Sequence, residues 1–195
     1  ADICHLLEEK LLPKLYLQFP QLKLERMVTT THTAKQYLTN GLADLSFLCA
    51  VKPSSLLEYV PLLHDTLCLA VPESMISAEI RAGGLAACGC LPFVLPDEQQ
   101  FGRELVDRLS RREHLYPISL YTAAGWKDLV RLADEGYGAA ILPERSAARL
   151  EHCEVLPLEN APSFDFVCAV PRYAEPSPAC MALIELARKH FATHG

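Results

Sequence analysis

The chain has 195 residues, of which 50% are hydrophobic and 22% are charged. This composition excludes a disordered or low-complexity protein, which would contain fewer apolar residues. The length suits one large domain or two lobes of about 100 residues each. The formal net charge of −6 argues against a nucleic-acid-binding module, because a negative surface repels the phosphate backbone. No run of about 18 apolar residues occurs, so the sequence predicts no membrane span.

The chain opens with a predicted helix and a predicted strand. Apolar residues recur at three- and four-residue spacing over residues 3–15, which places them on one helix face. Asp2 can cap this helix with its carboxylate, and Pro20 ends it. Residues 22–28 alternate apolar and charged side chains, which predicts a half-buried strand.

A second helix is predicted to begin at Thr29, Thr30 and Thr31 and to end at Gly41, which adopts a positive φ without strain. The predicted strands after it are residues 44–51, 67–71, 91–95, 118–121, 138–142, 155–158 and 164–170. The predicted helices are residues 101–112, 126–134 and 143–150, and a last helix that starts at Ser177-Pro178. This last helix is predicted to bury Met181, Ile184, Leu186 or Ala187, and Phe191. The glycines within residues 83–89 indicate a looser region. This order predicts an α/β fold with mostly parallel sheets.

Eight cysteines fall at positions 4, 49, 68, 88, 90, 153, 168 and 180. Cys49, Cys68 and Cys168 lie in apolar strand-like runs and Cys180 lies on a helix face, where free thiols behave as small hydrophobes. The first residues contain no basic segment and no cleavage motif of a signal peptide. We therefore expect free thiols in a reducing cytoplasm, since disulfide frameworks are typical of short secreted chains.

Four sequence blocks in a fixed order resemble a known family. They are Leu12-Pro13 with Phe19-Pro20; residues 40–47 (Asn-Gly-Leu-Ala-Asp-Leu-Ser-Phe); residues 60–62 with 67–72 (Val-Pro-Leu and Leu-Cys-Leu-Ala-Val-Pro); and residues 132–143 (Leu-Ala-Asp-Glu-Gly-Tyr-Gly-Ala-Ala-Ile-Leu-Pro). The last block is similar to the pattern V-x-x-G-x-G-I-x-x-L-P. Over essentially its whole length the chain resembles the effector-binding (regulatory) domain of bacterial LysR-type transcriptional regulators.

This resemblance implies an α/β, two-lobed, type 2 periplasmic-binding-protein-like fold, in which two Rossmann-like subdomains are joined by two crossover strands. Two apolar strands, 67–71 and 166–170, each end in a Val-Pro pair and suit the crossovers. Regulatory subdomain I would then be residues 1–71 plus 171–195, and regulatory subdomain II would be residues 72–170.

Two features depart from the family pattern. The winged helix-turn-helix that binds DNA in this family precedes the effector-binding domain and is absent from the sequence. DNA contact is therefore expected only through that missing N-terminal domain. The family's first lobe also opens with a strand, whereas the helix here begins almost at Ala1.

The resemblance further implies that a small effector binds in a cleft between the lobes. Helix N-termini favour anions, so we expect a small organic acid or an amino-acid-like metabolite. The candidate effector-binding residues are Asp2, Thr29, Thr30, Thr31, Phe101, Gly102, Arg103, Gly125 and Trp126.

Each group of candidates also has a purely structural interpretation. Thr29–Thr31 can contact a ligand or can simply cap their helix. Arg103 can pair with a carboxylate through two nitrogens or can be a solvated side chain. Small residues before Trp126 let a ligand approach the backbone, while the indole can form a ligand wall or pack in the core.

Neither a catalytic site nor a cofactor or metal site is predicted. The sequence contains no G-x-x-x-x-G-K-[ST], G-x-G-x-x-G, G-x-S-x-G or H-E-x-x-H motif and no paired carboxylates. Cys88-Gly89-Cys90 lacks the C-x₂-C spacing and the partner pair of a zinc site. These two thiols either form a strained, easily reduced disulfide or lie free in a loop.

The resemblance thus implies a cytoplasmic effector-sensing domain that is not an enzyme and that forms a homodimer or tetramer, and symmetric homo-oligomers are also the general expectation. The exposed faces of residues 3–19 and 103–115 are the expected dimer contact. The alternative is the solute-binding protein of a transporter with the same fold, and an enzyme on this fold is a third hypothesis.

Overall fold

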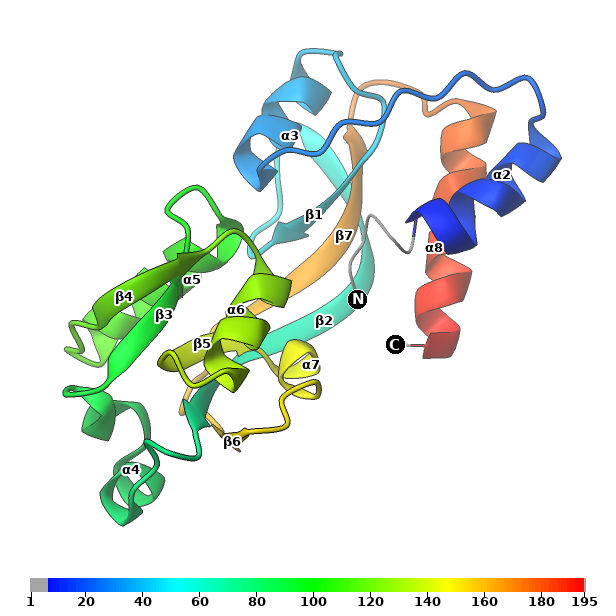
Figure 1. Cartoon of the computed structure of the whole chain (residues 1–195). Coiled ribbons are helices and arrows are strands. Elements are labelled where there is room, and N and C mark those ends of the chain that lie inside the picture. Colours follow the sequence, from blue (N-terminus) through cyan, green and yellow to red (C-terminus); the bar gives the residue numbers. More distant parts are fainter. Residues whose placement is uncertain (1–6, 195) are drawn as a thin grey trace. The chain divides into compact units, whose positions relative to one another are not determined.

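The computed structural model describes residues 7–194, which divide into two units (Figure 1). Unit 1 consists of the described residues up to His64 together with those from Phe164 onward, and unit 2 is Asp65–Ser163. The chain passes between the units along β2 (Leu57–Pro72) and at the start of β7 (Ser163–Pro171). The predicted subdomain boundaries, at 71/72 and 170/171, lie at the C-terminal ends of β2 and β7.

Unit 1 is a small sheet with helices on both faces. Its other elements are η1 (Leu7–Leu11, a π-helix), α2 (Leu12–Gln18), α3 (Thr31–Thr39), β1 (Ser46–Ala50) and α8 (Pro178–His194). β1 pairs antiparallel with β7, with Phe47 opposite Cys168 and Leu48 opposite Val167. Side chains alternate along a strand, so Leu48 packs with α3 while Phe47 packs on the opposite face with α2 and α8.

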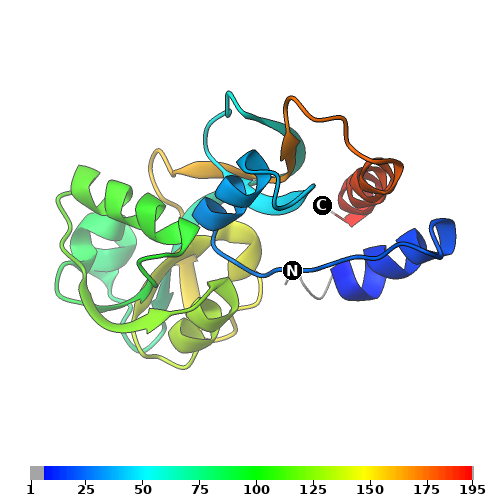
Figure 2. The ribbon, with the colours of Figure 1, turned by 90° about the horizontal axis from the view of Figure 1, so that it is seen from above.

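Helices α2 and α8 lie side by side in both views of the chain (Figures 1 and 2). The contact is apolar: Leu11 and Leu15 pack against Leu183 and Ala187, and all four are buried. Although the sequence predicts that Met181 is buried in the last helix, its side chain is 57% exposed. Ala187, predicted as the alternative to Leu186, is fully buried, and the buried stripe of α8 also includes Leu183, four residues away on the same helix face.

Unit 2 carries a mixed sheet rather than a mostly parallel one. Its elements besides β2 are α4 (Ala78–Gly83), η2 (Gly84–Cys88, a 3₁₀-helix), β3 (Pro92–Pro96), α5 (Phe101–Arg112), β4 (Ile118–Ala123), α6 (Trp126–Asp134), β5 (Ala139–Pro143), α7 (Glu144–Ala147) and β6 (Cys153–Leu156). β3 pairs in parallel with β4 and β5, whereas β2 pairs antiparallel with β5 and β6. The prediction of mostly parallel sheets is wrong because β2 runs opposite to β5.

Two glycines of the 132–143 block have separate structural reasons. Gly136 ends α6 with a φ of +84°, a conformation that side-chain-bearing residues rarely adopt. Gly138 leads into β5, and a Cβ there would lie 2.7 Å from the carbonyl oxygen of Pro92. β5 itself is buried along its whole length, as expected for a central strand covered on both faces.

Several predicted elements are confirmed, and others are wrong. Helices 101–112 and 126–134 form with the predicted bounds. The region 83–89 is not a loose loop, because α4 and η2 occupy residues 78–88. The strand predicted at 67–71 extends back to Leu57, since its first half has partly exposed, mixed side chains that conceal a strand pattern.

Residues 22–28 do not form the predicted strand. Their side chains do alternate, because Leu22 and Leu24 pack toward α2 and α8 while Lys23 and Glu25 are exposed. Between described residues, however, the only backbone hydrogen bond of this segment is from Leu22 N to Phe19 O, at 3.0 Å. A strand needs a neighbouring strand, and none of the described strands lies beside this segment.

Candidate functional site

The candidate site in unit 2 is the sheet edge at which β3 and β4 both end. The two strands are parallel, with Leu95 opposite Thr122 and Pro96 opposite Ala123, so their carboxyl ends meet at the same edge. Asp97 N donates to Ala123 O at 2.9 Å and ties the two ends together. Helices α5 and α6 begin just beyond them. In open α/β sheets, ligands bind outside the carboxyl ends of parallel strands.

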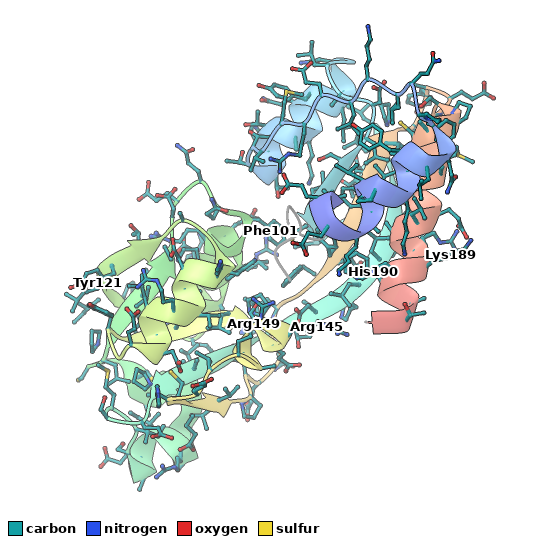
Figure 3. The ribbon with its side chains drawn as sticks, turned by 45° about the vertical axis from the view of Figure 1, so that its right-hand side comes forward. Phe101, Tyr121, Arg145, Arg149, Lys189 and His190 are labelled. Atoms are coloured by element: carbon teal, nitrogen blue, oxygen red, sulfur yellow. The ribbon has the colours of Figure 1, made fainter. Side chains whose placement is uncertain are left out.

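A tight loop leads from β3 into α5. The Asp97 carboxylate accepts a hydrogen bond from Gln99 N at 3.0 Å, and Asp97 O accepts one from Gln100 N at 2.9 Å. Gln100 is the N-cap, and its side chain makes no cap bond to a described residue. Phe101 begins the first turn and is half-buried (Figure 3). The start of α5 has the partial positive charge of a helix N-terminus, and the Gln100 side chain does not neutralise it.

The N-cap residue of α6, like that of α5, makes no side-chain cap hydrogen bond. Gly125 is its N-cap, in extended backbone with φ −178° and ψ 175°, and it has no side chain with which to cap the helix. A Cβ at Gly125 would meet nothing within 4 Å among the described atoms. The backbone at this position is therefore open to an incoming group.

Gly102 and Trp126 bring the two helix starts into contact. Gly102 is buried, and a Cβ added there would overlap the indole ring of Trp126. Trp126 is itself half-buried and packs against the core cluster of unit 2 that includes Val94, Ala123 and Leu129. The absence of a side chain at residue 102 is thus a packing requirement of the indole ring.

Arg103 is already engaged within α5. Its Nε donates to Asp107 Oδ1 at 2.8 Å, and its Nη1 donates to Pro96 O at 3.3 Å. The side chain is 22% exposed, so the guanidinium is held along the helix and against the end of β3. A ligand carboxylate would share this cation with Asp107, which lessens its attraction for an anion.

Thr29, Thr30 and Thr31 lie in unit 1 at the start of α3. Thr30 is the N-cap, and its Oγ1 accepts from Thr33 N at 3.3 Å, as the capping interpretation expects. The Oγ1 atoms of Thr30 and Thr33 are also 3.1 Å apart, within hydrogen-bonding distance. Thr29 and Thr31 line a cavity of unit 1 instead of capping the helix. The remaining predicted residue, Asp2, lies outside the described residues.

Sequence reasoning did not select Asp97 as a site residue. Its carboxylate shapes the loop between the end of β3 and the start of α5, and its backbone N–H joins that loop to β4. The available signal was a Pro-Asp pair directly after an apolar strand. Reasoning also missed the pair of Tyr121 and Tyr137, whose ring centroids lie 4.8 Å apart in an edge-to-face arrangement. Figure 3 shows Tyr121 on β4, and no local sequence signal could have joined it to Tyr137.

The cysteines show no arrangement for catalysis in the described structure. Cys88 is buried in η2, where its Sγ donates to Gly84 O at 3.4 Å and burial raises its pKa. Cys90 is exposed, and both are free thiols. Burial also raises the pKa of Cys68 and Cys168 to about 12, which keeps these thiols protonated at neutral pH. Within residues 7–194, no group of three or more His, Cys, Asp or Glu side chains is placed to hold a metal ion.

A known protein family matches almost the whole chain. The model of the LysR substrate binding domain family matches residues 3–192. A search of curated proteins found no significant match. No described helix has both the length and the apolar character that a membrane crossing requires.

Several solved structures share the fold at low sequence identity. The effector binding domain of QuiR in complex with shikimate has a TM-score of 0.69 and 20% identity, covering 96% of this chain and 93% of that one. The BenM effector binding domain with its effector benzoate has a TM-score of 0.70 and 19% identity, covering 97% and 87%. The Synechocystis PCC6803 CcmR regulatory domain in complex with 2-PG has a TM-score of 0.72 and 16% identity, covering 93% and 89%.

The chain therefore has the type 2 periplasmic-binding-protein-like α/β fold that the sequence predicts. It belongs to the LysR substrate binding domain family, the effector-sensing domains of LysR-type transcriptional regulators. This membership confirms the resemblance stated from the sequence blocks. It favours an effector sensor over the solute-binding protein of a transporter.

Proposed function

We propose that the chain senses a small anionic metabolite and that the N-terminal ends of α5 and α6 are its anion-binding groups in unit 2. The observation that carries this proposal is that two helices, of 12 and 9 residues, begin beside each other at the carboxyl ends of two paired parallel strands. Helix N-termini present N–H groups and partial positive charge to a ligand. Shikimate and benzoate, the ligands of two solved relatives, are both carboxylates.

The binding groups in this proposal are mainly backbone. Gly125 leaves the start of α6 open, while Phe101 and Trp126 supply apolar and aromatic surface for the body of the ligand. Arg103 contributes little attraction for an anion, since Asp107 already pairs with its guanidinium. Thr29–Thr31 stay a prediction from the family resemblance. The proposal involves binding without catalysis.

Effector binding would act by shifting the populations of conformations or of oligomers. A ligand can shift such an equilibrium only by its differential affinity for the two states. We propose a homodimer or a larger homo-oligomer as the responding assembly, in which effector binding alters transcription through the DNA-binding domain typical of the family. Symmetric homo-oligomers are also the general expectation for soluble assemblies.

Thermal unfolding in the presence of matched ligand pairs tests this function. Small carboxylates are compared with their neutral amides or esters, such as benzoate with benzamide, and the molar mass is followed by light scattering. A ligand at 100 times its Kd stabilises a protein by about 2.7 kcal/mol, enough to raise the Tm by several degrees. We expect stabilisation by a carboxylate but not by its neutral partner. Equal stabilisation by both members of every pair would contradict an anion site.

A further inference from the structure

The C-terminal end of α5 is tied to the loop of residues 157–162, which joins β6 to the crossover strand β7. The tie is the Arg112 side chain, whose Nη1 donates to Asn160 O and whose Nη2 donates to Glu159 O, both at 2.8 Å. Its Nε donates to Glu113 Oε1 at 2.8 Å, which orients the guanidinium. Each nitrogen of the planar guanidinium thus has a partner, and two of the three partners are backbone carbonyls of the loop.

The same loop is also tied to β2, the other crossover strand. Leu67 N of β2 donates to Pro162 O at 3.1 Å, and the next residue, Ser163, is the first of β7. Leu67 is fully buried, so its bond to the loop is shielded from water. Arg112 therefore holds α5 against the point at which both crossover strands reach unit 2.

Left-handed backbone is concentrated at this contact. Within the described part of the chain, the residues other than glycine with a positive φ are His114 and Asn160, at +52° and +47°. Arg112 bonds the carbonyl of Asn160, and His114 lies two residues beyond Arg112 in the turn that follows α5. Asn and His tolerate this conformation better than most residues, but it still persists only where the surrounding structure holds it. Such positions gather at ligand clamps and switch regions, which points to a role for this contact beyond packing.

Helix α5 connects this contact to the proposed anion site. Phe101 lies at one end of the helix and Arg112 at the other, about 16 Å apart at a rise of about 1.5 Å per residue. Leu105, Val106 and Leu109 are buried between them, so the helix is anchored along its length. At 0.15 M salt the screening length is about 8 Å, so the charge of Arg112 has little direct effect on an anion at the other end. Any influence of Arg112 on the anion site must therefore act through the position of the helix.

We infer that Arg112 is a positioning residue that couples the anion site at the start of α5 to the two crossover strands. This inference rests on the proposed function. An anion shared by the starts of α5 and α6 fixes the position of α5, and in that position Arg112 reaches both loop carbonyls and the contact is closed. When the contact opens, α5 can shift and its start separates from that of α6. The loop at the same time loses the anchor that keeps Pro162 O on Leu67 N.

Coupling of this kind is reciprocal. The factor by which a bound anion favours the closed contact equals the factor by which the closed contact favours the anion, and such factors are usually about 5- to 150-fold. Hydrogen exchange at the Leu67 amide reports opening, because this amide must first leave Pro162 O. Leu69, two residues further along β2 and opposite Ile141 and Leu156, reports opening of the sheet itself. The two amides therefore distinguish opening of the contact from general unfolding.

The test follows exchange at both amides and titrates benzoate and shikimate by calorimetry. Arg112→Gln removes the two bonds to the loop. Arg111→Gln is the matched control, because Arg111 is also exposed in the last turn of α5 but its Nε donates to Asp107 O of the same helix, at 3.1 Å. Arg112→Lys keeps the charge, but one ammonium cannot copy the planar fork, so its effect should be intermediate. It also provides the same comparison if Arg112→Gln does not fold.

We expect Arg112→Gln, but not Arg111→Gln, to speed exchange at Leu67 at least about fivefold while exchange at Leu69 stays unchanged. A saturating anion should slow exchange at Leu67 of the unchanged protein at least about fivefold, and Arg112→Gln should weaken the binding of that anion by the same factor. Equal anion affinity in the two glutamine variants, or equal slowing at Leu67 and Leu69, would overturn the coupling and leave the anion site standing. If neither anion binds the unchanged protein, the proposed function fails and the coupling fails with it.

Discussion

Gly102 on α5 lies so close to the indole of Trp126 on α6 that no side chain fits between them. This contact brings together the starts of two helices, at Phe101 and Trp126, that are separated in the chain by helix, strand and loop. On its other side the tryptophan packs against the core of unit 2. The spacing of the proposed anion site thus depends on a glycine that itself offers the ligand no side chain.

Substitution Gly102→Ala is expected to destabilise unit 2 by about 1–3 kcal/mol, the usual cost of overpacking a close contact. The added methyl must displace Trp126 or move α5 away from it. Urea unfolding followed by tryptophan fluorescence measures the change. Gly89→Ala is a control for losing a glycine, because a Cβ at Gly89 meets nothing within 4 Å of the described structure.

A double-mutant cycle with Trp126→Phe isolates this contact. The smaller ring leaves room for a methyl, so Gly102→Ala should cost at least about 0.5 kcal/mol less in the Trp126→Phe background. Unfolding of the variants with Trp126→Phe is followed by circular dichroism, because Trp126 is the only tryptophan and these variants have no tryptophan fluorescence. Additive effects of the two substitutions would show that the contact does not set the helix spacing.

Substitution Thr30→Ala is expected to cost about 1 kcal/mol, because it removes the N-cap bond to Thr33 N at the start of α3. Thr39→Ala is the matched control at the other end of the helix, where the hydroxyl only donates to Gln36 O at 3.0 Å. Thermal unfolding of both variants measures the difference. If Thr30→Ala also lowers the affinity for a carboxylate more than tenfold, while Thr39→Ala does not, Thr30 contacts the effector as well. An unchanged Tm for Thr30→Ala would contradict the capping role.

The cysteines should differ sharply in their reaction with iodoacetamide at neutral pH. Cys90 is exposed and should be labelled in the native protein. Burial raises the pKa of Cys68 and Cys168 to about 12, so they should react only after unfolding. Peptide mass spectrometry after timed labelling distinguishes the sites. Labelling of Cys68 at the rate of Cys90 would contradict the buried β2 core.

Asp65 should make the stability of unit 2 fall as pH rises through the mildly acidic range. Burial raises its pKa from the ordinary value of 3.8, against opposing hydrogen bonds from the backbone N–H groups of Thr66 and Arg145. The folded state therefore binds the Asp65 proton more tightly than the unfolded state does. The stability that this proton contributes is present below pH 3.8 and is lost as pH rises from 3.8 through the raised pKa. Asp65→Asn stays neutral, so it should gain stability relative to the unchanged protein across that interval. Denaturant midpoints from pH 3 to 7 measure this, and parallel pH profiles would contradict it.

The elements that sequence reasoning placed correctly are those with local signals. α5 and α6 have amphipathic spacing over at least nine residues, and both were predicted with their observed bounds. Residues 22–28 have an equally clear strand pattern, yet pairing depends on a neighbour that is not local in sequence. The first half of β2 was missed for the related reason that its side chains are only partly buried.

The candidate site could be predicted only in part. Local sequence located the helix starts at Phe101 and Trp126, because small and polar residues precede them. It could not show that Gly102 and Trp126 touch, since that contact depends on the parallel pairing of β3 and β4. Nor could it show that Arg103 is held by Asp107 and Pro96 O. Only the structure indicates that the groups available for binding at this site are mainly backbone ones.

The most direct test of an anion site is calorimetric titration of Gly125→Asp with a carboxylate that stabilises the unchanged protein. Aspartate is a good N-cap and the space is open, so the variant should fold with equal or slightly higher stability. Its carboxylate would repel a bound anion about 4 Å away by more than about 1.4 kcal/mol, so the affinity should fall at least about tenfold. Gly125→Asn, which caps without charge, should lose much less. Unchanged affinity in Gly125→Asp would contradict anion binding at the start of α6.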